Sequence, residues 1–102
     1  MRVLPIALDP DQLAAFCRRH HVVEFSLFGS ILGDEFRPDS DVDVLVQFEP
    51  GHTLTLDSYV EMREQLAAQL GGREIDLVEL RRLADPYRRH EILRTREVVY
   101  AR

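Results

Sequence analysis

The stretch from Asp41 to Phe48 constrains the fold more than any other, because it reads as a buried strand that carries two carboxylates. Its β-branched and aromatic residues alternate toward one face, and they are Val42, Val44, Val46 and Phe48. Asp41 and Asp43 share the other face with Leu45. Aspartate is disfavoured in strands, and like charges about 5 Å apart repel by a few kcal/mol at an effective dielectric constant of about 20. A chain that keeps both aspartates is therefore expected to gain a bound cation, or solvent exposure at the strand end.

A third carboxylate, Asp76, lies in another apolar run, from Glu74 to Leu80, which also predicts a strand. If this strand neighbours the one that begins at Asp41, the three carboxylates converge. Ligand sets made only of oxygen suit Mg²⁺, which commonly takes one or two carboxylates together with substrate phosphates. Two such ions, about 3.5–4 Å apart, activate an attacking hydroxyl and stabilise a leaving group.

The remaining periodicity predicts helices and strands that alternate along the chain. Strand formers occupy residues 22–28, with Val23, Phe25 and Leu27 toward one face, and a short helical turn is expected at residues 30–33. Residues 98–100 predict a final short strand. The order predicts an α/β (α+β) fold: a small mixed β-sheet with helices packed mainly on one side.

Cap signals place the helix starts. Asp9-Pro10 and Asp85-Pro86 each offer an N-cap followed by a proline at the first helical position. Ser58 and Glu61 have the spacing of a capping box, which predicts that the middle helix begins near Ser58.

Composition narrows the function classes. The 102 residues fit one domain, and the single cysteine, Cys17, excludes a disulfide framework within the chain. All thirteen basic residues are arginine, which excludes lysine chemistry, and the net charge of −5 argues against direct nucleic-acid binding. No apolar run approaches the roughly 18 residues of a membrane span, so a cytoplasmic protein is expected.

Gly29 and Ser30 follow the strand that ends at Phe28 and precede the expected helical turn. A glycine lets the backbone approach a ligand closely, and a hydroxyl together with backbone N–H groups suits an anion. Such a pair is a weak signal alone, but the paired aspartates follow eleven residues later across a polar turn. The combination predicts a phosphate site beside a metal site.

These motifs resemble the polymerase-β-like nucleotidyltransferase superfamily. The resemblance rests on Leu27-Phe28-Gly29-Ser30, on Arg37-Pro38-Asp39-Ser40-Asp41-Val42-Asp43-Val44-Leu45-Val46 and on the Asp76 strand. With residues 1–102 read as a single minimal nucleotidyltransferase domain, the chain is similar to the stand-alone members that act as antitoxins of HEPN toxins. The implied fold is the palm-like one of polymerase β.

The resemblance implies a role for each motif residue. Gly29 and Ser30 would hold the triphosphate of ATP, and Asp41, Asp43 and Asp76 would be catalytic and bind the metal, with two Mg²⁺ ions expected. The reaction would transfer AMP to a tyrosine hydroxyl of a HEPN ribonuclease toxin, encoded by a neighbouring gene, and silence it. The two proteins would form a hetero-oligomer.

The chain departs from the family pattern after Ser30. The family commonly has an arginine and then a glycine in this segment, whereas this chain reads Ile31-Leu32-Gly33-Asp34. Two other interpretations stay open: an antitoxin that neutralises its partner by binding without catalysis, and a transferase acting on a small molecule such as an aminoglycoside. The second ranks last, because 102 residues leave no room for a substrate domain.

Overall fold

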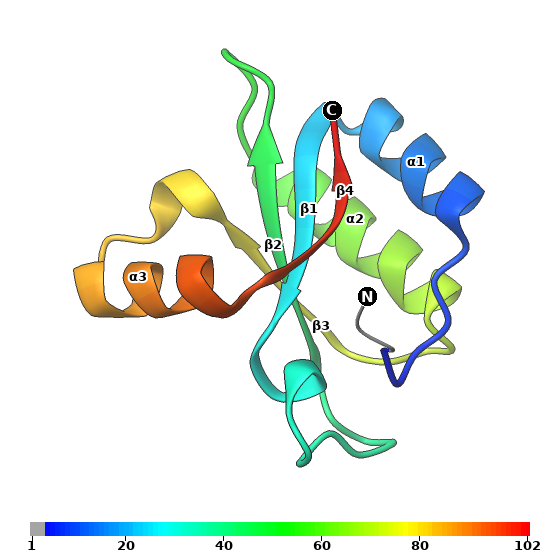
Figure 1. Cartoon of the computed structure of the whole chain (residues 1–102). Helices are drawn as coiled ribbons and strands as arrows, with labels where there is room; N and C mark the ends of the chain where they lie inside the picture. The colour runs from blue at the N-terminus through cyan, green and yellow to red at the C-terminus, as the bar shows by residue number, and fades with distance from the viewer. Residues whose placement is uncertain (1–3) are drawn as a thin grey trace.

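The chain forms one mixed sheet that is covered by helices on both faces (Figure 1). This computed structural model describes residues 4–102. In chain order, the elements are α1 (Pro10–Arg19), β1 (Val22–Phe28), the 3-10 turn η1 (Gly29–Leu32), β2 (Val42–Phe48), α2 (Leu56–Gln69), β3 (Ile75–Glu79), the 3-10 turn η2 (Leu80–Arg82), α3 (Pro86–Thr95) and β4 (Glu97–Ala101).

The strand order is β3-β2-β1-β4. β1 pairs antiparallel with both β2 and β4, whereas β2 and β3 run parallel. A parallel pair needs a crossover connection, and α2 supplies it between β2 and β3. The C-terminal end of β1 and the N-terminal ends of β2 and β3 therefore lie together at one end of the sheet.

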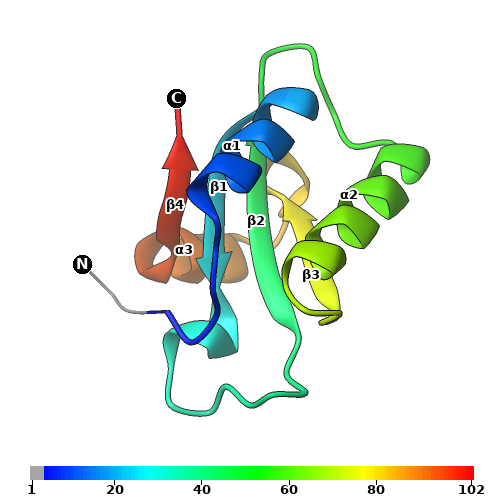
Figure 2. The ribbon, with the colours of Figure 1, turned by 90° about the vertical axis from the view of Figure 1, so that its right-hand side faces the viewer.

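The two faces of the sheet carry cores of different size. The larger core packs α1 and α2 against one face and contains Phe16, Val44, Met62 and Leu66. The smaller core packs α3 against the other face through Ile92, Phe28 and Leu45. Figure 2 shows α1 and α2 in front of the sheet and α3 behind it. The expected α+β fold with helices mainly on one side is confirmed, and α3 is the helix that lies on the other side.

Two details differ from the sequence-based expectations. A β-bulge between Val22 and Glu24 inserts Val23 as an extra residue, so Val22 rather than Val23 points into the core. The helix start predicted at Ser58 is also wrong: α2 is capped by Thr55. The Thr55 hydroxyl accepts from the Ser58 backbone N–H, and the Ser58 hydroxyl accepts from the Thr55 N–H in return. The predicted caps Asp9 and Asp85 are confirmed.

Cys17 is fully buried against the larger core. Burial raises the pKa of its thiol to about 12, with Arg102 and Arg18 acting weakly in the other direction. The thiol therefore behaves as a small apolar side chain. Across residues 4–102, the helices are too short and too polar for any of them to cross a membrane.

A buried carboxylate joins the end of β3 to the segment before α2. Glu79 is 3% exposed, and it accepts hydrogen bonds from the Thr53 hydroxyl at 3.1 Å and from the Leu54 backbone N–H at 3.2 Å. Its charged partner is Arg82, whose Nε lies 3.3 Å from a Glu79 oxygen. Arg82 also donates to the Leu54 carbonyl at 2.8 Å. The buried charge is thus fully partnered, as burial requires.

We expect Glu79→Ala to lower the free energy of unfolding by about 2 kcal/mol, because it leaves the buried Leu54 N–H without its charged acceptor. Urea denaturation measures the change. The matched control is Glu74→Ala: Glu74 is exposed and pairs with Arg63 at the surface, so a loss below about 1 kcal/mol is expected. Equal losses in the two variants would contradict the structural role of Glu79.

Candidate active site

The strand pairing brings two of the three predicted carboxylates side by side. Asp43 lies opposite Phe28 of β1 on one side and opposite Asp76 of β3 on the other. Partners in register on neighbouring strands project from the same face of a sheet. The structure therefore meets the condition set by the sequence, that the Asp76 strand neighbours the strand that carries Asp43.

Gly29 forms one wall of this site. It takes a φ of +77°, a left-handed conformation that favours glycine, and a Cβ built on it would lie 2.1 Å from the Asp43 Oδ2 atom. A Cβ atom essentially never lies that close to another heavy atom, so a side chain at this position would force the Asp43 carboxylate or the backbone to move. The close approach fixes the Asp43 carboxylate against the turn between β1 and η1, and the exposed Ser30 follows directly in η1.

The electrostatics of the site favour a cation. Burial raises the pKa of Asp43 from 3.8 to about 6, and the negative charge of Asp76 is the second cause. A hydrogen bond between the two carboxyl groups and the charge of Asp41 raise this pKa further, while Arg88 of α3 lowers it slightly. The two neighbouring carboxyl groups therefore tend to share a proton. A divalent cation can take the place of that proton, and these oxygen donors fit Mg²⁺ by their chemistry.

Asp41 is set apart from the other two carboxylates. It precedes the first residue of β2 and is exposed, so no strand pairing fixes its side chain. Within residues 4–102, no three histidine, cysteine, aspartate or glutamate side chains are gathered closely enough to hold a metal ion. The structure thus pairs Asp43 with Asp76 and leaves Asp41 next to them, near enough for its charge to act on Asp43.

The sequence analysis assigned no role at the site to two arginines that lie near it. Arg88 belongs to a run of C-terminal arginines that reads as a solvated surface, yet its charge acts on Asp43. Arg73 precedes β3 and donates to the carbonyl groups of Arg37 and Ser40, just ahead of Asp41. Neither contact has a local signature, because each joins residues more than thirty positions apart.

The comparison with known families agrees with the geometry. Residues 11–102 match the family described as polymerase beta, nucleotidyltransferase. The match spans nearly all of the chain and includes the β1–Gly29-Ser30 turn, the two strand-start aspartates and Asp76. The chain therefore belongs to the polymerase beta nucleotidyltransferase family.

Within this family, the chain is similar to an adenylyltransferase and to a minimal nucleotidyltransferase. The chain is 45% identical over 60 residues to the protein adenylyltransferase MntA of Thermococcus cleftensis. That match covers 59% of this chain and 58% of the relative, so it spans little more than half of that protein. A solved structure of a candidate minimal nucleotidyltransferase is 37% identical and has a TM-score of 0.66, covering 88% of this chain and 95% of that one.

A second similar structure is a complex. It contains the tri-AMPylated HEPN toxin of Shewanella oneidensis together with an MNT antitoxin. The matched chain is 20% identical, with a TM-score of 0.64, and the match covers 91% of this chain and 70% of that one. At this identity the comparison shows that the two chains share a fold.

We expect Asp43→Asn to stabilise the protein at neutral pH when divalent ions are removed with EDTA. The pKa of Asp43 is higher in the folded protein, so folding favours the protonated carboxyl. The free energy of unfolding should then fall as the pH rises between about 4 and 6 and stay low above that range. Two pKa units set a ceiling of about 3 kcal/mol, and partial solvent exposure reduces the expected gain to about 1 kcal/mol.

Urea denaturation at pH 5, 6, 7 and 8 measures this effect. The gain from Asp43→Asn should be largest at pH 7 and 8 and shrink toward acidic pH. Asp39→Asn serves as the control, because Asp39 is an exposed acid in the preceding turn. A gain of equal size at every pH, or the same gain in the control, would argue against a raised pKa of Asp43 in the folded protein.

Proposed function

We propose that this chain is a protein adenylyltransferase and the antitoxin of a HEPN-family toxin. It transfers AMP from ATP to a tyrosine hydroxyl of that toxin, which a neighbouring gene encodes, and so silences it. The observation that carries the proposal is the pairing of Asp43 with Asp76 directly beside Gly29. The adenylyltransferase relative and the AMPylated HEPN toxin in the similar complex supply the acceptor class.

In this proposal, Asp41, Asp43 and Asp76 hold divalent ions, with two Mg²⁺ ions as the resident pair. Asp41 completes the set by turning its exposed side chain toward the other two. When bound, the ions offset the charge of the phosphates and of the carboxylates and make the acceptor hydroxyl more acidic. Gly29 and Ser30 hold the triphosphate, Gly29 through its exposed backbone and Ser30 through its hydroxyl.

The transfer is a displacement at the α-phosphorus of ATP. The tyrosine oxygen forms a bond to that phosphorus, while the bond from the phosphorus to the oxygen bridging the α- and β-phosphates breaks, and pyrophosphate leaves. Asp76 is exposed, whereas Asp43 is half-buried against Gly29, so Asp76 is the carboxylate placed to take the hydroxyl proton. Asp43 stays fixed between β1 and β3 and orients the reacting groups.

The acceptor protein completes the site. The carboxylates lie at an open end of the sheet, and Asp41 and Asp76 are both exposed. This arrangement suits a protein acceptor that supplies both the tyrosine and the surface that encloses it at this end of the sheet. A hetero-oligomer with the toxin is therefore part of the proposal.

The decisive experiment measures the intact mass of the neighbouring gene's protein after incubation with this chain, ATP and Mg²⁺. We expect a gain of one or more whole AMP units, and we expect Asp41→Asn to abolish it. Because Asp41 is exposed and precedes the first strand residue, this variant should keep the wild-type melting temperature. Full transfer by the Asp41→Asn chain would refute the proposed metal site.

A second outcome would replace the proposal. If the two proteins form a tight complex, with no gain of mass and with ribonuclease activity suppressed, the chain is an antitoxin that acts by binding alone. In that case, protection by Asp41→Asn should equal protection by the wild type.

Gly29→Ala should also abolish the transfer. The added Cβ collides with the Asp43 carboxylate 2.1 Å away, and the φ of +77° disfavours alanine. Gly33→Ala is the matched control, because the nearest atom to its Cβ would be 3.8 Å away. The same mass measurement reads out both variants, and equal transfer by both would show that the contact at Gly29 is not needed.

A further inference from the structure

The three carboxylates are not held in place by equally strong restraints. Asp43 and Asp76 lie within paired strands, whose ladder fixes them relative to each other. Asp41 follows the turn of residues 37–40 and has no partner residue in the ladder. Its position therefore depends on whatever holds that turn.

Arg73 holds the turn from the side of β3. Its Nη1 atom donates to the carbonyl oxygens of Arg37 at 3.0 Å and Ser40 at 3.2 Å. Its guanidinium also lies over the Phe36 ring, 4.5 Å from the ring centroid. The Ser40 carbonyl belongs to the peptide bond that leads into Asp41, so the hydrogen bond from Arg73 restrains the backbone directly before this carboxylate.

The turn itself is closed by local bonds. The Ser40 N–H donates to the Arg37 carbonyl at 3.0 Å, and the Arg37 N–H donates to the Ser40 hydroxyl at 2.9 Å. The Val42 N–H then donates to the Glu74 carbonyl at 2.9 Å, which begins the pairing of the two strands. Arg73 and Glu74 thus fasten the lead-in of β2 to the lead-in of β3 on both sides of Asp41.

We propose that Arg73 is a positioning residue for Asp41: it fastens the turn of residues 37–40 to the start of β3, so that Asp41 can join Asp43 and Asp76 around a divalent cation. The inference rests on the proposed metal site. Arginine suits this role because one planar group donates to two carbonyls while stacking on an aromatic ring. Lysine offers a point charge without that plane.

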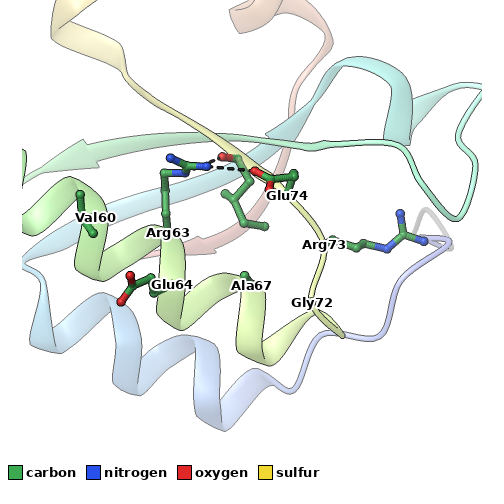
Figure 3. Close-up of a pocket in the computed structure, with 8 residues that line it drawn as sticks. Val60, Arg63, Glu64, Ala67, Gly72, Arg73 and Glu74 are labelled. Atoms are coloured by element: carbon green, nitrogen blue, oxygen red, sulfur yellow. Dashed lines mark hydrogen bonds and ion pairs between the residues drawn. The ribbon is translucent and has the colours of Figure 1, made fainter.

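Arg63 provides a matched comparison within the same structure. Its Nε donates to the Ile75 carbonyl at 3.1 Å, and its Nη2 pairs with Glu74 at 3.0 Å. Both arginines line a cavity between α2 and the segment that leads into β3. Figure 3 shows the two contacts of Arg63 on one side of this cavity, while the Arg73 side chain points away from them. The Ile75 carbonyl also precedes a proposed ligand, Asp76, but it belongs to a strand that the ladder already fixes.

The test measures Mn²⁺ binding to the free chain by electron paramagnetic resonance, without ATP or partner. We expect Arg73→Ala to weaken Mn²⁺ binding roughly 10-fold, the scale typical of residues that orient metal ligands. Arg63→Ala should stay within about 2-fold of the wild type, because the ladder holds Asp76 without it. Thermal unfolding of the same samples separates loss of binding from loss of the fold.

A double-mutant cycle tests whether Arg73 acts through Asp41. If it does, adding Arg73→Ala to Asp41→Asn should change the Mn²⁺ affinity by less than about 2-fold, since the residue it positions has already lost its charge. An additive 10-fold loss in the double variant would overturn the proposal. Arg73→Lys keeps the positive charge in case the alanine variant does not fold, and it should still weaken Mn²⁺ binding.

The outcomes distinguish the role of Arg73 from the existence of the metal site. Wild-type affinity in Arg73→Ala and Arg73→Lys, with Asp41→Asn impaired, would overturn the role of Arg73 and leave the metal site standing. Failure of the wild type to bind Mn²⁺, or an affinity indifferent to Asp41→Asn, would overturn the metal site and the role of Arg73 together.

Discussion

The rest of the site depends on the double pairing of β2 at Asp43. Antiparallel pairing places Asp43 opposite Phe28, next to the Gly29 turn, and parallel pairing places it opposite Asp76. Val42 and Val44 hold this register, because both are fully buried in the larger core. A slip of one residue would turn Asp43 into that core and the valines out of it. The apolar side of β2 thus determines where its acidic side can meet a ligand.

The pairing of Asp43 with Asp76 lowers the stability of the folded protein when no cation is bound. Two carboxyl groups lie side by side next to a backbone that leaves no room for a side chain, and the pKa of Asp43 is raised, first by burial and then by the charge of Asp76. Arg88 of α3 offsets it only slightly. Crowded charges of this kind are typical of functional sites, where charge is arranged for a ligand rather than for the empty fold.

Much of this fold is predictable from local patterns. The alternating valines of β2 and the aspartate-proline caps of α1 and α3 are each set by residues close in sequence, and the structure confirms them. The pairing of Asp43 with Asp76 follows once β2 and β3 are taken as neighbours.

The remaining details depend on contacts between distant segments. The bulge at Val23 is set by the pairing of Val22 with Phe48. Glu79 can be buried because Thr53, Leu54 and Arg82 provide partners for its carboxylate. The hydrogen bonds of Arg73 join it to a turn more than thirty residues earlier. A charged residue in the sequence reads as a surface residue until the partner that buries or restrains it is known, which is why these roles have no local signature.

The burial of Cys17 makes the chain convenient for spectroscopy. With its only thiol fully enclosed and its pKa raised to about 12, the native protein presents almost no thiolate to alkylating reagents. One cysteine introduced at an exposed position such as Tyr87 would then accept a fluorophore or spin label at that site alone, in an otherwise natural background. The approach of another protein toward α3 could be followed from such a label.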